Sequence, residues 1–294
     1  MKPTPHPALP ELAAFSGVAV FSVMDALMKR SSIEAGVFVA LLLRSGCGTL
    51  LTAPLWLVSR PNRPNIGAIR LHLLRSIAVA IMAVLFFWGL VRIPMAEGIA
   101  LSFIAPLIAL YLAAILLGER IQPRAIAASL IGFSGVIVIL AARLADHGME
   151  SRSLWGAAAI LASAVLYAWN LVLQRQQALI AGPLEVAMFQ NLLVFLCLLP
   201  FSPLLGAWPQ GPTLLDIGLA ACLAAAALML LSWAYGRAET QTLVPLEYTA
   251  FAWSALMGWL WFGEAVTAAT VVGVVLIVAA CLIAARKRTE ATAV

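Results

Sequence analysis

Four polar residues lie on one face of a hydrophobic stretch in the second half of this 294-residue chain. Ser163, Tyr167, Asn170 and Gln174 are spaced as i, i+4, i+7 and i+11, which places them on one face of an α-helix. Their hydroxyl and amide groups suit recognition of a polar solute. A helix in lipid turns such a stripe toward a cavity, water or another helix, because exposing it to hydrocarbon is costly. We expect the stripe to line a translocation path; the alternative is that it hydrogen-bonds neighbouring helices and holds the bundle together.

A matching stripe occurs 145 residues earlier and consists of Val18, Ser22, Asp25 and Lys29. The whole chain repeats with this offset, without gaps through several long stretches. The aligned pairs include Arg30 with Arg175, Trp88 with Trp233, Arg92 with Arg237, and Gly118-Glu119 with Gly263-Glu264. The two stripes are therefore expected to face each other across a pseudo-twofold axis.

Positions that differ between the repeats are candidates for substrate contacts, because a substrate lacks the symmetry of the repeat. The differing positions are Asp25 against Asn170, Lys29 against Gln174, Ser102 against Glu247, and Arg44 against Gln190-Asn191. Ionisable groups are thereby concentrated at Asp25, Lys29, Arg44 and Glu247.

The charged residues of the first repeat allow more than one interpretation. Arg44 lies inside a predicted span, where a lone guanidinium needs a carboxylate, either from a side chain such as Asp25 or from the substrate. Asp25 and Lys29 are four residues apart and could simply form an intrahelical ion pair. Lys29 could also extend its ammonium group into the lipid headgroups.

Glu247 is the candidate of the second repeat, with Phe251 and Ser254 on the same helix face. We expect it to line the cavity as a cation contact or a proton acceptor. Trp169 and Tyr248 are also predicted to lie deep in the membrane, where they could stack on an amphipathic solute or pack in the core.

The two Gly-Glu pairs are interpreted as structural. Gly118-Glu119 ends the predicted fourth span and Gly263-Glu264 ends the ninth. Because the next helix begins directly afterwards, we expect both pairs to act as loop anchors or helix caps.

The elements that position these residues are membrane helices. Hydrophobic residues make up 63% of the chain and charged residues 11%, whereas a soluble domain has about 25% charged residues. Each spanning helix needs about 20 mostly apolar residues. The sequence predicts an all-α polytopic protein with ten spans, at 11–28, 35–58, 71–91, 95–117, 124–142, 154–174, 184–205, 213–235, 242–262 and 266–285.

The spans divide into two five-helix repeats, 11–142 and 154–285, joined by the connecting loop 143–153 and flanked by the tails 1–10 and 286–294. An odd number of spans inserts the second repeat upside down, and an inverted repeat is typical of secondary transporters, with the binding site at the midplane. Basic residues are more numerous in the segments that lie on the same side as both tails. This bias predicts cytoplasmic termini and an inner-membrane protein.

The sequence argues against other classes of function. His6, His72 and His147 lie near span ends or in tails, and there is no metal-binding or nucleophile motif, so we expect neither an enzyme nor a metal or cofactor. The net charge of +5 reflects loop arginines near anionic lipid and not nucleic-acid binding. A membrane receptor or scaffold is the non-transport alternative.

Two five-helix halves that each end their fourth span with Gly-Glu resemble the EamA type of the drug/metabolite transporter superfamily. The run Pro245 to Thr249, then Trp253, Gly258 and Phe262-Gly263-Glu264, is similar to the ninth span of its bacterial permeases. The resemblance implies a ten-helix basket with spans five and ten outside and a central cavity. Known branches export amino acids, including aromatic ones, efflux cationic drugs, or import metabolites such as S-adenosylmethionine or riboflavin.

From the resemblance and the charged residues together we expect a monomer or homodimer in lipid that exports amino acids by alternating access. The substrate carboxylate would meet Arg44 or Lys29, and its ammonium group Asp25 or Glu247. The alternatives are uptake of a larger metabolite and efflux of cationic drugs.

Overall fold

The computed structural model of the chain describes residues 9–59, 64–105, 107–108, 111–112, 123–147, 151–204, 208–209, 211–238, 243 and 246–285, and no strand occurs among them. The first repeat forms α1 (Leu9–Ala35), α2 (Val37–Val58), α3 (Ile66–Leu90), α4 (Met95–Ser102) and α6 (Pro123–His147). The second forms α7 (Ser151–Ile180), α8 (Pro183–Leu198), the short 3-10 helix η1 (Leu199–Leu204), α9 (Pro212–Tyr235), α11 (Ala250–Phe262) and α12 (Ala268–Ala285). The residues Pro106, Gly118, Glu119 and Pro245 lie outside the described residues.

The helices have the length and composition of membrane spans. Six hydrophobic stretches, on α1, α2, α3, α7, α8 with η1, and α9, are long and apolar enough to cross a bilayer, and shorter apolar helices lie within α6, α11 and α12. Large apolar side chains also cover the outside: Leu50 and Leu215 are each 76% exposed. Such surfaces are favourable in lipid and unfavourable in water. The predicted all-α polytopic membrane fold is therefore confirmed.

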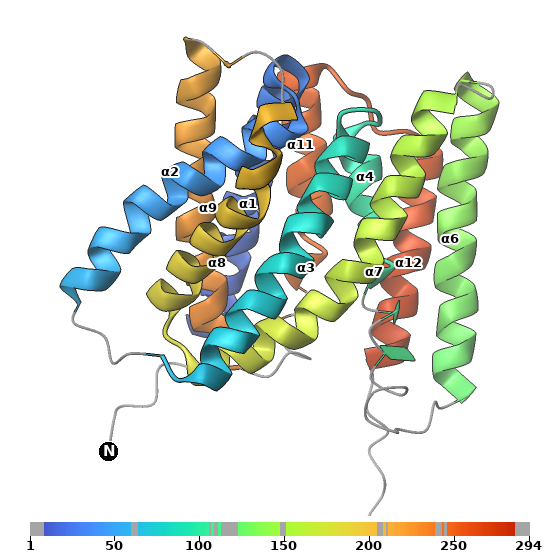
Figure 1. Cartoon of the computed structure of the whole chain (residues 1–294). Coiled ribbons are helices and arrows are strands. Elements are labelled where there is room, and N and C mark those ends of the chain that lie inside the picture. The colour runs from blue at the N-terminus through green and yellow to red at the C-terminus, as the bar shows by residue number, and fades with distance from the viewer. Residues whose placement is uncertain are drawn as a thin grey trace, which may run out of the picture.

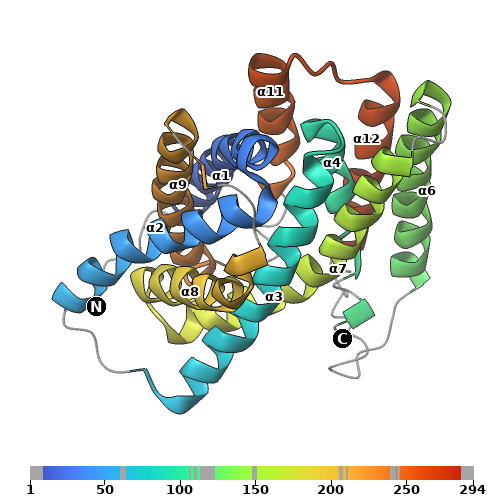
Figure 2. The same ribbon diagram turned by 45° about the horizontal axis from the view of Figure 1, so that its top comes forward.

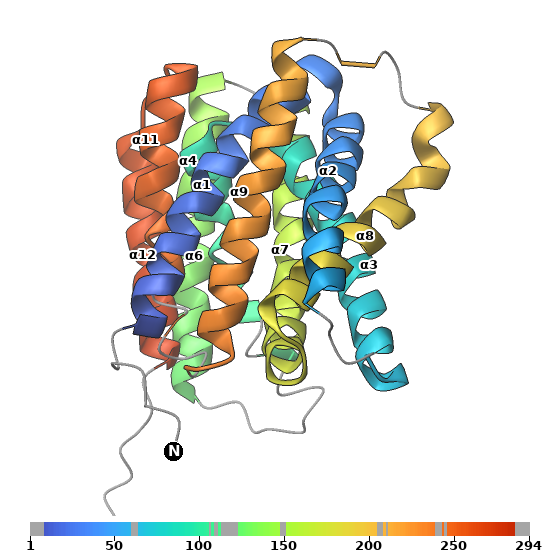
Figure 3. The same cartoon turned by 90° about the vertical axis from the view of Figure 1, so that its left-hand side faces the viewer.

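The two repeats run in opposite directions. In Figure 3, α1 rises from the lower end of the bundle, and in Figure 1, α7, which begins the second repeat, descends from the upper end. The second repeat is thus inserted upside down relative to the first, as an odd number of helices requires.

Contacts between the helices follow the same symmetry. The most extensive ones join α1 to α9, α3 to α7, α6 to α12 and α2 to α8. Exchanging the repeats converts the α1–α9 contact into the α7–α3 contact, and it maps the α6–α12 and α2–α8 contacts onto themselves. Figure 2 shows α6 and α12 together at one side of the bundle. The two halves are thus interleaved, and their interface forms the centre of the molecule.

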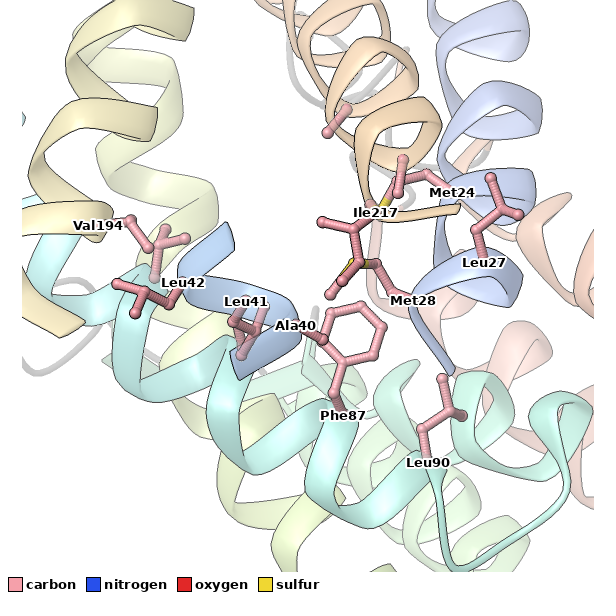
Figure 4. Close-up of a cluster of buried hydrophobic side chains, with 14 of the residues drawn as sticks. Met24, Leu27, Met28, Ala40, Leu41, Leu42, Phe87, Leu90, Val194 and Ile217 are labelled. Carbon is pink, nitrogen blue, oxygen red and sulfur yellow. The ribbon is translucent and has the colours of Figure 1, made fainter. Parts of the chain in front are cut away.

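The largest apolar cluster lies in this interface (Figure 4). Its labelled members come from α1, α2 and α3 of the first repeat and from α8 and α9 of the second: Met24, Leu27, Met28, Ala40, Leu41, Leu42, Phe87, Leu90, Val194 and Ile217. This packing fixes the helices that carry the polar stripes.

Close approach of α6 and α12 depends on two glycines. A Cβ atom added at Gly135 would lie 2.6 Å from the carbonyl oxygen of Gly273, and one added at Gly273 would lie 2.8 Å from that of Gly135. Small residues let membrane helices pack backbone to backbone. Gly135 and Gly273 thus let α6 of the first repeat pack directly against α12 of the second.

Replacing Gly135 by Ala should therefore destabilise the bundle. The added methyl group forces the two helices apart, and overpacking of this kind costs about 1–3 kcal/mol. We expect a clear fall in the thermal unfolding midpoint of the detergent-purified protein. Gly218→Ala in α9 is the matched control, because nothing lies within 4 Å of the atom that it adds. Equal midpoints for the two variants would contradict the assigned packing.

Four helices extend by five or more residues beyond the predicted spans. α1 continues to Ala35, α6 to His147 and α7 to Ile180, and α3 begins at Ile66. Arg75, near the start of the predicted span 71–91, counts among the basic residues on the side of the tails, but the structure buries its side chain within α3. Without Arg75 and the buried Lys29, basic residues are still more numerous in the segments on the side of both tails than on the other side.

Candidate functional site

A cavity of about 250 Å³ lies between the two repeats, and its lining comes from both of them. Its polar and charged lining residues are Ser22, Asp25, Arg44, Arg75, Ser102, Ser163, Tyr167, Asn170, Gln174, Gln190, Asn191, Glu247 and Tyr248. Apolar and aromatic side chains complete the wall, among them Phe21, Phe86, Phe87 and Phe103.

Both polar stripes reach this cavity. All four residues of the α7 stripe line it, from Ser163 to Gln174, and Ser22 and Asp25 line it from α1. Ser163 also donates a hydrogen bond to the Met82 carbonyl (3.0 Å). Stripe residues therefore line the cavity, and Ser163 also hydrogen-bonds a neighbouring helix. That this cavity belongs to a translocation path stays a prediction.

Glu247 is held at the cavity wall by two tyrosines. The Tyr167 hydroxyl on α7 donates to Glu247 Oε2 (2.6 Å), and the Tyr235 hydroxyl at the end of α9 donates to Oε1. Hydrogen bonds to a charged acceptor are stronger than neutral ones, so the two tyrosines fix the carboxylate in position. Beside it, the Tyr248 ring packs edge-on against Phe103, with centroids 5.1 Å apart.

Arg44 lines the cavity from α2 with few partners. Its Nη1 atom lies 3.6 Å from the sulfur of Met24, and its buried Nε atom has no hydrogen-bond partner among the described residues. Asp25 lines the same cavity, but the two side chains do not approach to ion-pair distance. The guanidinium group therefore retains hydrogen-bonding capacity in the cavity.

Arg75 is a cavity residue that the sequence analysis missed. Its Nε atom donates to Asn170 Oδ1 (2.9 Å), its Nη2 atom to Gln174 Oε1 (3.3 Å), and its Nη1 atom to Gln177 Oε1. Comparison of the repeats could have found it, because Arg75 aligns with Ala220 and is therefore another ionisable position that differs between them. It was overlooked because hydropathy placed Arg75 near the start of a span.

Lys29 lies outside the cavity lining and joins the two repeats. Its ammonium group forms an ion pair with Glu264 Oε1, donates to the Ile93 carbonyl (3.0 Å) and lies over the Phe262 ring at 4.8 Å. The intrahelical pair with Asp25 is absent from the ion pairs of the described residues, and Lys29 is too deeply buried to reach headgroups.

Gly263 and Glu264 follow directly after α11, and Glu264 is the residue that pairs with Lys29. Gly263 has φ +63°, a left-handed conformation that favours glycine at a helix C-terminus. Glu264 Oε2 accepts a hydrogen bond from the backbone nitrogen of Met95 (2.7 Å), at the first residue of α4. One carboxylate thus caps a helix of the other repeat and neutralises Lys29.

The remaining candidates lie outside the cavity lining. Phe251 packs in an apolar cluster with Ile99 and Phe103, and the fully buried Ser254 donates to the Phe251 carbonyl (2.9 Å). Trp169 is half-buried.

Comparison with known proteins identifies the family of the chain. The model of the EamA-like transporter family matches the chain twice, over residues 8–141 and 154–286. The chain belongs to the EamA-like transporter family. The two matches coincide with the two inverted repeats. Through this family, the EamA-like chain is a member of the drug/metabolite transporter superfamily.

Several curated relatives of this EamA-like chain are transporters of different molecules. The pseudopaline exporter CntI of Pseudomonas aeruginosa (strain UCBPP-PA14) is 28% identical over 287 residues, covering 94% of each chain. A riboflavin transporter of Rhizobium johnstonii is 30% identical over 214 residues, covering 72% of this chain and 68% of the relative. The aromatic amino acid exporter YddG of Ancylobacter novellus is 29% identical over 178 residues, covering 58% and 60%.

One solved crystal structure shares the fold, with a TM-score of 0.63 at 23% identity over 94% of this chain and 96% of that chain. That likeness shows the fold alone. Membership of the EamA-like transporter family makes the chain a multi-pass secondary transporter of small metabolites and not an enzyme, as expected from its sequence.

Proposed function

We propose that this transporter exports amino acids from the cytoplasm across the bacterial inner membrane. The observation that carries the proposal is the charge pattern of the cavity, where Arg44 and Arg75 face one space with Asp25 and Glu247. A zwitterion places a carboxylate and an ammonium group a few bonds apart, and such a site can bind both. Charge-assisted hydrogen bonds of this kind are stronger than neutral ones.

The size and walls of the cavity support a substrate of amino-acid size. Its volume of about 250 Å³ is below the range of roughly 300–1,000 Å³ that is typical of pockets for drug-sized ligands. The phenylalanines of the wall suit an apolar or aromatic side chain. A flavin-sized solute or a bulky cationic drug would need a larger space than the one in this conformation.

The proposed mechanism is alternating access. The cavity lies at the interface of two inverted repeats, so rocking one repeat against the other would expose the same residues first to one side of the membrane and then to the other. The bias of basic residues supports a topology with both termini in the cytoplasm.

Counterflow in proteoliposomes tests the proposal. Vesicles loaded with an unlabelled amino acid should accumulate the labelled one, and phenylalanine, leucine, glutamine and glutamate form the first panel. Riboflavin and a lipophilic cation are included as competing substrates. Uptake of either of these without any amino acid flux would overturn the proposal in favour of metabolite uptake or drug efflux.

Growth assays give the direction. A strain that expresses the chain should resist toxic analogues of aromatic amino acids if the protein exports them. Sensitisation to the same analogues would show import and would contradict the proposed direction, although not the substrate class.

A further inference from the structure

Arg75 is a buried cation without a carboxylate partner among the described residues. It is 2% exposed, and its three hydrogen bonds go to the amide oxygens of Asn170, Gln174 and Gln177. The ion pairs of the described residues do not include it. Amide oxygens satisfy the geometry of a guanidinium group but do not neutralise its charge, and an uncompensated charge within a membrane protein is expensive.

The three amides instead hold the guanidinium plane in a fixed orientation. A guanidinium group has five N–H donors, so three hydrogen bonds leave two donors, one on each terminal nitrogen. A carboxylate can bind a guanidinium group in a bidentate manner through one donor on each of two nitrogens. Because Arg75 lines the cavity, a bound anion can provide the direct carboxylate contact that the described residues do not.

Further contacts behind Gln177 set the orientation of its amide group. The Gln177 oxygen accepts from Arg75, so its amide nitrogen is left to donate to His72 Nδ1. His72 Nε2 then faces Glu185 Oε1 at 3.2 Å, and the imidazole ring stacks on Phe189 at 4.5 Å. These contacts, made by residues of α3, α7 and α8, fix the Gln177 amide so that its oxygen, and not its nitrogen, faces Arg75.

Arg75 and Arg44 are two separate cationic groups of one cavity. Arg44 belongs to α2 and contacts Met24 of α1. Arg75 belongs to α3 and is hydrogen-bonded to α7. A simple zwitterion has a single carboxylate and can occupy only one of them. We propose that Arg75 binds a second acidic group, so that the preferred substrate is an amino acid with an additional carboxylate on its side chain. This inference rests on the proposed function and specifies its substrate class.

The test is the preference of the transporter between substrates that differ by one acid group. Competition in counterflow compares glutamate with glutamine, and 4-carboxyphenylalanine with phenylalanine. Glutarate, which has two carboxylates and no amine, is included as a further competitor. We expect the wild-type protein to prefer the diacid of each pair by about tenfold or more, which corresponds to about 1.4 kcal/mol.

The Arg75→Gln variant should lose this preference, so that the diacid-to-monoacid ratio falls toward one. Arg75→Lys keeps the charge without the planar fork and should retain an intermediate ratio. Gel filtration and thermal unfolding in detergent establish that each variant is folded. A purely structural role for Arg75 would lower transport of all substrates together and leave the ratio unchanged, and that outcome would overturn the inference.

The remaining outcomes separate the inference from the proposed function. Transport of amino acids with no preference for diacids would overturn the inference and leave the function standing. Transport of glutarate that depends on Arg75, without amino acid flux, would support an anion site at Arg75 but overturn both the inferred substrate class and the proposed function. If none of these compounds moved, both would be wrong.

Discussion

Replacing Lys29 by Met is expected to destabilise this transporter by about 3–5 kcal/mol, the usual cost of leaving one charge of a buried ion pair without its partner. Lys29 is 3% exposed and pairs with Glu264 across the interface of the repeats. Without the ammonium group, the Glu264 carboxylate keeps one hydrogen-bond donor among the described residues, the backbone nitrogen of Met95. The Ile93 carbonyl loses its donated hydrogen bond as well.

The double variant Lys29→Met/Glu264→Gln provides the internal check. Its neutral amide can still accept from the Met95 nitrogen, and no charge is left unpaired, so much of the lost stability should return. Midpoints of thermal unfolding in detergent for the wild type, both single variants and the double variant complete a double-mutant cycle. Additive effects of the two substitutions would contradict a direct ion pair.

Arg30→Gln is the matched control on the neighbouring residue. The Arg30 side chain is half exposed and lies 3.8 Å from Glu34 and 3.3 Å from Asp216. Exposed ion pairs contribute only about 0–1 kcal/mol. The control should therefore unfold close to the wild type, and a fall as large as that of Lys29→Met would indicate a general effect of lost positive charge on α1.

Helical periodicity predicted the fold and part of the site because both depend on local spacing. The spacing from Ser163 to Gln174 defines one face of a helix whatever surrounds it, and that face lines the cavity. The offset of the repeats likewise predicted two antiparallel bundles, because an odd number of spans reverses the second one.

The same patterns did not predict partners that are distant in sequence. Lys29 and Gln174 are equivalent in the repeat, and both were expected in the cavity. Only the folded chain shows that Lys29 pairs with Glu264, 235 residues away, while Gln174 holds Arg75. Hydropathy also marks the start of a span poorly where polar residues such as His72 and Arg75 follow its first turns. The predicted span therefore began five residues after α3 does, and Arg75 was taken for a residue near the membrane surface.

Arg44→Gln should reduce counterflow of amino acids by about 10- to 100-fold. Arg44 is the cavity cation with the fewest partners, having one contact to the Met24 sulfur and a buried Nε atom without a partner among the described residues. A hydrogen bond to a charged group contributes about 1.5–3 kcal/mol, and every 1.4 kcal/mol changes an equilibrium constant tenfold. The loss should therefore appear chiefly as weaker binding of the substrate carboxylate.

The control for this substitution is Arg237→Gln, which removes an exposed guanidinium at the end of α9. Arg237 lies over the Trp233 ring at 4.3 Å and donates to the Trp233 carbonyl (3.2 Å), away from the cavity lining. Initial rates of counterflow at several substrate concentrations separate affinity from turnover, and both variants must elute as folded protein. If Arg44→Gln matched Arg237→Gln in rate and affinity, the substrate carboxylate would not bind at Arg44, and the charge pattern of the cavity would need Arg75 alone as its anion site.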